Sequence, residues 1–420
     1  MKDEDSVDVI SFIQGGQHLE TGSSLDGIKQ KLAELSNVKN LSFLLGAGAS
    51  ADAIPSMVEM YKEITQEVND ADEKHVSAQN KALYSSISKT NLEDVLNILY
   101  AKKAYLEGVS KLETQADASA RVDANVDASV DTDAGAGVDQ LIKFIEGRMF
   151  SKININLDDA KYVNSLNLYK ELYQKTALRN KDLSRINIFT TNNDLLNEKA
   201  LDNLNINYNN GFGGGLDRVF NPARFHYTFS QKIDANLEKF EPLENMVYLY
   251  KLHGSISWIE QEGNSLFNIK EIPVVGGVDA DTSNHVLIYP TPLKQSQSLG
   301  SPYSDLIREF QTKISQPNSV IFIIGYSFSD DHLNNIIYQA LASNSSISVV
   351  IFGDYKDCPL TKINDNRIYQ IFGKNGGHKI HYFEFIVNNL LPNLDENKET
   401  VLLDKFISAL KGVEDSGEKT

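Results

Sequence analysis

Short apolar runs that end in small or polar residues recur along this chain. Each run is too short for a helix and is typical of a strand buried on both faces of a parallel sheet. We therefore expect an α/β fold with a Rossmann-like open parallel sheet, in which the carboxyl ends of the strands line one ligand-binding edge. The runs are residues 41–45, 186–189, 247–252, 320–324 and 347–352.

Helical periodicity replaces these runs between residues 57 and 182. Apolar residues recur every three or four positions in residues 57–69, 92–100, 138–149 and 157–177, as on the buried face of a helix. The pattern predicts a helical subdomain over residues 57–182, inserted after the first strand. The Rossmann-like domain would then comprise residues 38–56 and 183–389.

Three further segments flank or interrupt these domains. The pattern in residues 1–37 predicts either an extra element packed on the domain or an N-terminal arm for assembly. Near residues 115–137, an acidic Val-Asp-Ala repeat with few large apolar residues predicts a mobile loop. Residues 390–420 predict a helix at 399–411 and a polar tail, and this helix is a second candidate for an assembly surface.

Composition excludes several classes of protein. The net charge of −17 and pI of about 4.9 argue against direct nucleic-acid binding unless a partner supplies basic charge. Cys358 is the only cysteine, which excludes a disulfide framework and a thiolate zinc cluster. The acidic start has no signal-peptide pattern, and no apolar run could span a membrane. We expect a soluble, cytoplasmic protein.

A glycine-rich turn follows the first apolar run. Glycines that let the backbone approach a phosphate, followed by a helix N-terminus, are typical of nucleotide sites, although a tight turn without a ligand is the alternative. Gly46-x-Gly48-x-x-Ala51 fits the dinucleotide fingerprint. The acidic ribose ligand expected about 20 residues further on is missing, because Glu63 and Glu67 fall on the surface of a predicted helix. This argues against a redox enzyme.

Polar residues follow the other apolar runs. Asn192 and Asp194 form either a functional pair or an Asx turn that caps the next helix. His253 follows the run at 247–252 and is either a general base or a structural histidine. The run at 320–324 leads into residues 325–331, whose hydroxyls and amides suit a phosphate or ribose, and whose acidic pair would cap the following helix.

Four of these motifs occur in the order found in sirtuin-like NAD-binding domains, a resemblance that spans roughly residues 40–56 and 183–356. They are Gly46–Ser50 with Ile54-Pro55-Ser56, Thr190–Asp194, Leu252-His253-Gly254 and Gly325–Phe328. In length, early helical insertion and N-terminal arm, the chain resembles the sirtuin-like NADases of bacterial antiphage defence. It is most similar to the subunit that pairs with a HerA-type hexameric ATPase.

This resemblance implies a role for each motif. Asn192 would hold the nicotinamide ribose or the attacking water, Asp194 the nicotinamide carboxamide, and His253 would be the general base. The remaining NAD contacts would be Gly46, Ala47, Gly48 and Ser50 at the pyrophosphate, Gly325, Ser327 and Phe328 on the phosphate and adenosine side, and Asp354 at a ribose.

The chain also departs from sirtuin deacylases. One cysteine cannot build their four-cysteine zinc ribbon, so no zinc is expected, and Ser56-Met57-Val58 replaces their Asp-Phe-Arg. Water is then the natural acceptor. The resemblance implies an NAD⁺ glycohydrolase that consumes NAD as its substrate, in an abortive-infection defence, as a homo-oligomer with the ATPase. An NAD-dependent deacylase or ADP-ribosyltransferase and a non-catalytic NAD or ADP-ribose sensor are the alternatives.

Overall fold

The structure is a computed structural model of the 420-residue chain. It describes residues 9–19, 24–87, 91–119, 132–179, 182–234, 239–261, 268–278, 285–287 and 301–393. The central part of the acidic repeat, residues 120–131, and the helix predicted at 399–411 lie outside the described residues.

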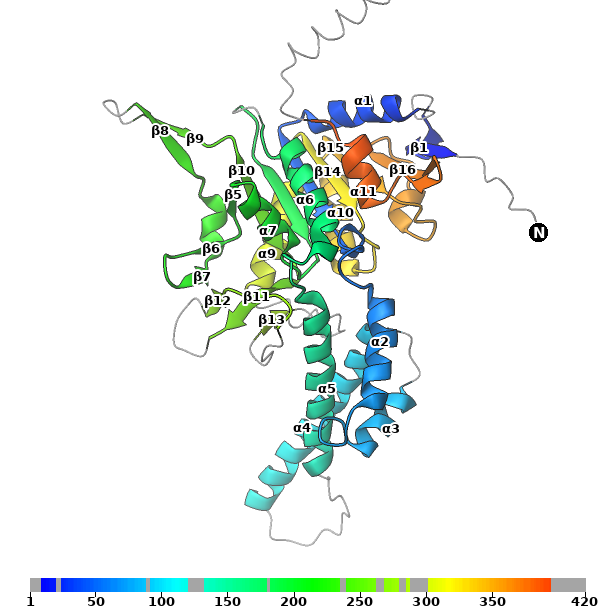
Figure 1. The fold of residues 1–420 in the computed structure, drawn as a ribbon, viewed down its shortest axis with the longest axis vertical. Coiled ribbons are helices and arrows are strands. Elements are labelled where there is room, and N and C mark those ends of the chain that lie inside the picture. The colour runs from blue at the N-terminus through cyan, green and yellow to red at the C-terminus, as the bar shows by residue number, and fades with distance from the viewer. Residues whose placement is uncertain are drawn as a thin grey trace, which may run out of the picture.

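A mostly parallel sheet forms the centre of the molecule (Figure 1). Its strand order is β2-β1-β16-β15-β14-β3-β4-β10-β5, and neighbours from β16 to β5 are parallel. All five predicted runs are strands of this sheet, which confirms the expected fold class. The parallel strands are β3 (Asn40–Leu45), β4 (Ile186–Thr190), β5 (Asn207–Asn209), β10 (Met246–Lys251), β14 (Ser319–Ile324), β15 (Ile347–Phe352) and β16 (Ile368–Asn375).

Helices cover both faces of the sheet, because the side chains of its strands alternate between two apolar cores. Phe43 of β3 packs on one side with α1 (Leu25–Ser36), α6 (Val163–Thr176) and α7 (Leu196–Asn203). Leu44 packs on the other side with α9 (Tyr303–Ile314) and α10 (Asp331–Ser343). β3 and β14 are buried along their whole length, as strands covered on both faces must be.

The N-terminal segment is built into this domain where it is described. β1 (Ile10–Gln14) pairs antiparallel with β16 and carries β2 (Gln17–His18) at the sheet edge. Ile28 and Leu32 of α1 are fully buried in the core. An assembly role for the segment stays a prediction. At the other end of the chain, β17 (His378–Lys379), α11 (Phe383–Phe385) and a π-helix (Ile386–Leu390) complete the domain.

The helices between residues 57 and 182 divide between two cores. α2 (Met57–Asp70), α3 (Ala78–Ser86), α4 (Leu92–Ser119) and α5 (Thr132–Ile153) share a core of their own and extend away from the sheet (Figure 1). We call these four helices the helical module. α6 packs on the sheet instead, because its apolar residues belong to the core that covers β3.

A second, antiparallel sheet lies between β4 and α9 in the sequence, and no sequence pattern predicted it. Its order is β13-β11-β12-β7-β6, and Trp258 packs there against Phe212 and Phe220. These strands are β6 (Phe212–Gly213), β7 (Arg218–Phe220), β11 (Gly254–Glu260), β12 (Ile269–Glu271) and β13 (His285–Leu287). Several are only two or three residues long, and so show no periodicity to recognise.

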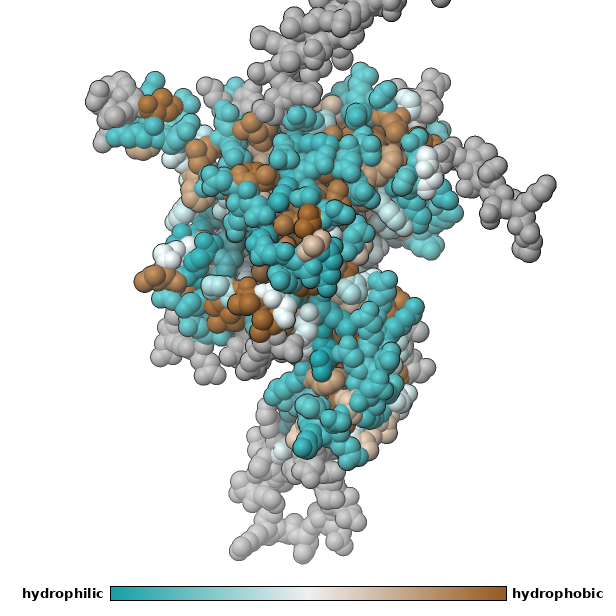
Figure 2. All heavy atoms as spheres, in the orientation of Figure 1, coloured by the Kyte–Doolittle hydropathy of each residue, from teal (hydrophilic) through white to brown (hydrophobic). Residues whose placement is uncertain are grey.

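A hairpin of β8 (Ser230–Asp234) and β9 (Lys239–Pro242) projects from the body (Figure 1). Ile233 and Phe240 on it are exposed, and Figure 2 shows apolar side chains there among hydrophilic ones. No helix among the described segments is long and apolar enough to cross a membrane.

The helical module contains an acid that should make its stability depend on pH. Glu146 of α5 accepts a hydrogen bond from Tyr100 of α4, and burial raises the pKa of Glu146 from 4.5 to about 7. The folded state therefore binds the proton of Glu146 more tightly than the unfolded chain does. The protonated carboxyl stabilises the fold below about pH 4.5, and this contribution is lost as the pH rises through about 7.

We expect the melting temperature to decrease across this pH interval, and Glu146→Gln to remove that part of the decrease in thermal unfolding followed by circular dichroism. Glu107→Gln, at an exposed position of α4, is the control and should leave the profile unchanged. Identical pH profiles for the wild type and Glu146→Gln would contradict the prediction.

Candidate active site

Four of the sequence motifs meet at one edge of the parallel sheet. β14, β3, β4 and β10 are consecutive neighbours, so their carboxyl ends lie side by side. The order β10-β4-β3-β14-β15-β16 is that of a doubly wound fold, with the winding direction reversing between β3 and β14. Ligands bind such sheets at this reversal. The glycine turn after β3 and the turn after β14 therefore stand at the expected ligand position.

These two turns pack backbone against backbone. Gly46 N donates to Ile324 O at 3.0 Å, and Gly48 N donates to Gly325 O at 2.9 Å. A Cβ on Gly46 would lie 2.5 Å from Gly325 O, and one on Gly48 would lie 2.7 Å from Gly325 Cα. Gly325 itself has φ +65°, in the left-handed region. Packing alone thus requires glycine at these three positions, and their contact with a phosphate stays a prediction.

Contrary to the prediction from the fingerprint, the glycine turn does not lead directly into an α-helix. It enters a 3₁₀ turn, Ala47–Ala49, and α2 begins only at Met57. The amides of Ala49 and Ser50 donate to Gly46 O and Ala47 O. A three-residue turn has almost no macrodipole, so any phosphate binding here would depend on individual backbone groups.

A buried hydrogen-bond network fixes the side chain of Asn192. Its Nδ2 donates to Gly46 O and to Ser50 Oγ, both at 3.0 Å. Ser50 Oγ donates to Asp194 Oδ2 at 2.9 Å, so the Tyr169 hydroxyl, 2.8 Å away, must donate to Ser50. Both hydrogens of Nδ2 are therefore donated to groups of the protein itself, and Oδ1 is the remaining polar atom of the Asn192 side chain.

This network gives Ser50 and Asp194 a supporting position. Both are almost fully buried, and Asp194 Oδ1 also accepts from Leu196 N at 2.9 Å at the start of α7. Asp194 therefore forms the predicted Asx turn, and Ser50 links its carboxylate to Asn192. Contacts of Ser50 with pyrophosphate and of Asp194 with the nicotinamide carboxamide stay predictions. Tyr169 comes from α6, a position that no sequence motif indicated.

A buried lysine holds the same loop from the other side. Lys251 at the end of β10 donates to the backbone oxygens of Asn193 and Asp194 and to Glu198 Oε1 at 2.9 Å. Burial raises the pKa of Glu198, and the charge of Lys251 opposes this effect. No sequence motif indicated Lys251. Its signal was a charged residue inside an apolar run that had to be a buried strand.

His253 lies two residues after the end of β10, and its backbone is tied to the Asn192 loop. Asn193 Nδ2 donates to His253 O at 2.7 Å and to Gly254 O at 3.1 Å. On the other side, His253 Nε2 lies 3.1 Å from Asp330 Oδ2. The imidazole thus links the loops after β10 and β14. The ends of β3 and β4 lie between these two loops. The sequence indicated Asp330 only as a cap of α10.

The remaining predicted NAD contacts lie further along this edge. Phe328 has φ +58°, a strained conformation for a bulky residue that is typical of functional sites. Its ring packs between Tyr326 and Tyr355, with both centroid distances at 5.1 Å. Ser327 is exposed, and Asp354 follows β15, one strand beyond the turn after β14.

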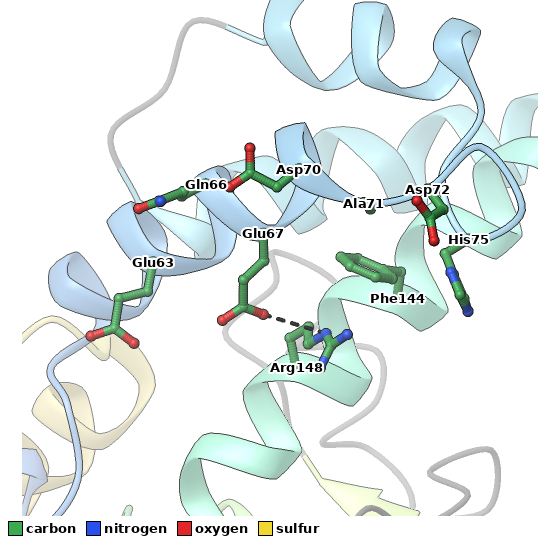
Figure 3. Close-up of a pocket in the computed structure, with 9 residues that line it drawn as sticks. All are labelled: Glu63, Gln66, Glu67, Asp70, Ala71, Asp72, His75, Phe144 and Arg148. Carbon is green, nitrogen blue, oxygen red and sulfur yellow. Dashed lines mark ion pairs between the residues drawn. The ribbon is translucent and has the colours of Figure 1, made fainter.

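A separate pocket of about 620 Å³ lies in the helical module (Figure 3). Glu63 and Glu67 of α2 line it, and both form ion pairs with Lys152 of α5. Glu67 also faces Arg148 at 3.3 Å. These two acids are thus on a helix surface, as the sequence indicated. Within the described ranges, no group of three or more His, Cys, Asp and Glu side chains is placed to hold a metal ion.

Comparison with known proteins bears on part of this site. Residues 186–369 match the family model of the SIR2-like domain. This segment is similar to SIR2-like domains. It contains the motifs after β4, β10 and β14 but not the glycine turn after β3.

Among solved structures, one similar chain is described as a Sir2 homolog in complex with NAD. It is 12% identical, with a TM-score of 0.37 over 86% of this chain and 91% of that chain. No match was found among curated proteins.

The contact between the two turns can be tested by adding one methyl group. Gly46→Ala should lower the free energy of unfolding by about 1–3 kcal/mol, because its Cβ would overlap the backbone of the turn after β14. Gly147→Ala is the matched control, since nothing lies within 4 Å of its Cβ in α5. This control should be neutral or stabilise by roughly 0.5–1 kcal/mol. Equal melting temperatures for the two variants would refute the packing explanation.

Proposed function

We propose that this chain is an NAD⁺ glycohydrolase that cleaves the nicotinamide–ribose bond. The observation that carries the proposal is that hydrogen bonds tie Asn192 and His253 to the two turns at the reversal of a doubly wound sheet, through Gly46 and Asp330. The match of residues 186–369 to SIR2-like domains supports an activity that uses NAD. NAD would be the substrate, bound along the edge formed by the four turns.

The residues suit this bond cleavage. When the C1′–N bond breaks, its electron pair neutralises the positively charged nicotinamide ring, so the leaving group needs little acid catalysis. The ribosyl group becomes an oxocarbenium-like cation, which the fixed dipole of Asn192 Oδ1 would stabilise. His253 would accept a proton from a ribose hydroxyl or from the attacking water. NAD⁺ and water then give ADP-ribose, nicotinamide and one proton.

The exposed parts of the two packed turns would hold the rest of the dinucleotide. Ala47 and Gly48 are exposed, so the pyrophosphate would lie against them, with Ser50 buried behind as the support of Asn192. On the other turn, Gly325 and Ser327 would contact phosphate. Phe328 would contact the adenosine, and the carboxylate of Asp354 would accept from a ribose hydroxyl.

Water is the proposed acceptor instead of an acylated protein. A single cysteine cannot form the zinc ribbon of sirtuin deacylases. The sequence that replaces their Asp-Phe-Arg also has another use here, because Ser56 forms a capping box with Glu59 at the start of α2. We therefore rank hydrolysis above deacylation or ADP-ribosyl transfer.

We further propose that the activity depletes NAD as the effector of an antiphage defence. The protein would assemble with itself and with a HerA-type hexameric ATPase, which would restrain it until infection. The resemblance in the sequence supports this role. The net charge of −17 fits a protein that meets nucleic acid only through a partner.

Two substitutions test the catalytic assignment. Asn192→Ala and His253→Ala should each lower NAD turnover at least roughly 100-fold, because each removes a group that acts only in the transition state. Nicotinamide and ADP-ribose are quantified by liquid chromatography with mass spectrometry, for the chain alone and with the ATPase. His332→Ala, at an exposed histidine of α10, is the control and should retain full turnover.

The same assay separates the alternatives. Acyl-ADP-ribose formed from NAD and an acylated peptide would indicate a deacylase. NAD binding without nicotinamide release, both alone and with the ATPase, would indicate a sensor and overturn the proposal. Melting temperatures within a few degrees of the wild type would show that the variants are folded.

A further inference from the structure

The carboxylate of Asp330 divides its two oxygens between two tasks. Oδ1 accepts hydrogen bonds from the amides of His332 and Leu333 at 3.0 and 3.2 Å, which caps α10. Oδ2 lies 3.1 Å from Nε2 of His253. The cap accounts for Oδ1 alone, so the second contact needs its own explanation.

The surroundings hold this carboxylate in place before any ligand binds. The backbone oxygen of Asp330 accepts from the hydroxyl of Tyr326 at 3.1 Å and from Asn334 N at 3.0 Å. The side chains of His253 and Asp330 are only 15% and 13% exposed. A charged hydrogen bond between groups that are both largely shielded from water and rigidly placed is stronger than a surface ion pair.

We propose that Asp330 is a positioning residue for His253. Its Oδ2 accepts the N–H of Nε2, which fixes the tautomer and leaves the lone pair on Nδ1. Nδ1 then receives the proton of the water or ribose hydroxyl, and the carboxylate stabilises the resulting imidazolium without moving a proton itself. This role rests on the proposed function, because it assumes that His253 acts as the base.

Asp330→Asn tests the role while keeping the helix cap, since asparagine caps helices as well as aspartate does. The amide has a similar shape, carries no charge and can donate to Nε2, which would favour the opposite tautomer. We expect kcat for NAD hydrolysis to decrease at least roughly 100-fold, with KM changed less than about threefold.

Asp331→Asn is the matched control. It removes the same charge one residue away, at an exposed position in the first turn of α10. It should leave kcat as in the wild type. Equal losses of kcat in the two variants, or full kcat in Asp330→Asn, would overturn the proposal.

A second measurement does not depend on activity. Nitrogen NMR of protein labelled at histidine reports which ring nitrogen carries the proton, and His253→Ala assigns the signal. At about pH 9, well above the ordinary titration range of imidazole, we expect the Nε2–H tautomer in the wild type and its loss in Asp330→Asn. An Nδ1–H tautomer in the wild type, or no change in the variant, would overturn the proposal. Without any NAD hydrolysis the proposed function fails, and this spectrum still decides whether the pair exists.

Discussion

The backbone contact between the turn after β3 and the turn after β14 is the constraint on which the rest of this site depends. The two strands are neighbours at the point where the winding of the sheet reverses, and their turns can close onto each other only where no Cβ intervenes. Gly46 then presents its carbonyl to Asn192, and that hydrogen bond sets the direction of the amide. A single methyl group in this contact would displace both the Gly46 carbonyl and the Asn192 amide.

From this contact a ring of interactions passes through all four turns. The turn after β3 holds Asn192 through Ser50, the Asn192 loop holds the backbone of His253 through Asn193, and His253 returns to the turn after β14 through Asp330. Each link joins residues that are far apart in the sequence and close at one sheet edge. Groups held from several sides need little reorganisation when charge develops, and this is the main source of electrostatic catalysis.

The inserted helices connect to this ring through more than one contact. α2–α5 bury their apolar residues mainly against one another, and Leu195 and Ile256, which flank the loops after β4 and β10, pack with the same core. α6 packs on the sheet and contributes Tyr169, whose hydroxyl bonds Ser50 below Asn192. Burial raises the pKa of Tyr169 well above its usual value, so it remains a proton donor to Ser50. A change in how α6 packs would therefore reach Asn192 through two hydrogen bonds.

The sequence by itself determined five of the parallel strands and which residues follow them, but it did not indicate β5 or β16. Buried strands need continuous apolar runs, and the polar residues that end those runs must gather at one sheet edge. It could not determine the partners of these residues. Lys251 and Tyr169 reach the Asn192 loop from other elements, and Asp330 meets His253 across two intervening strands. The glycines illustrate the division. Their spacing indicated close backbone approach, but only the tertiary structure decided that the approaching group is another turn of the same chain, because strand order is fixed by packing between distant segments.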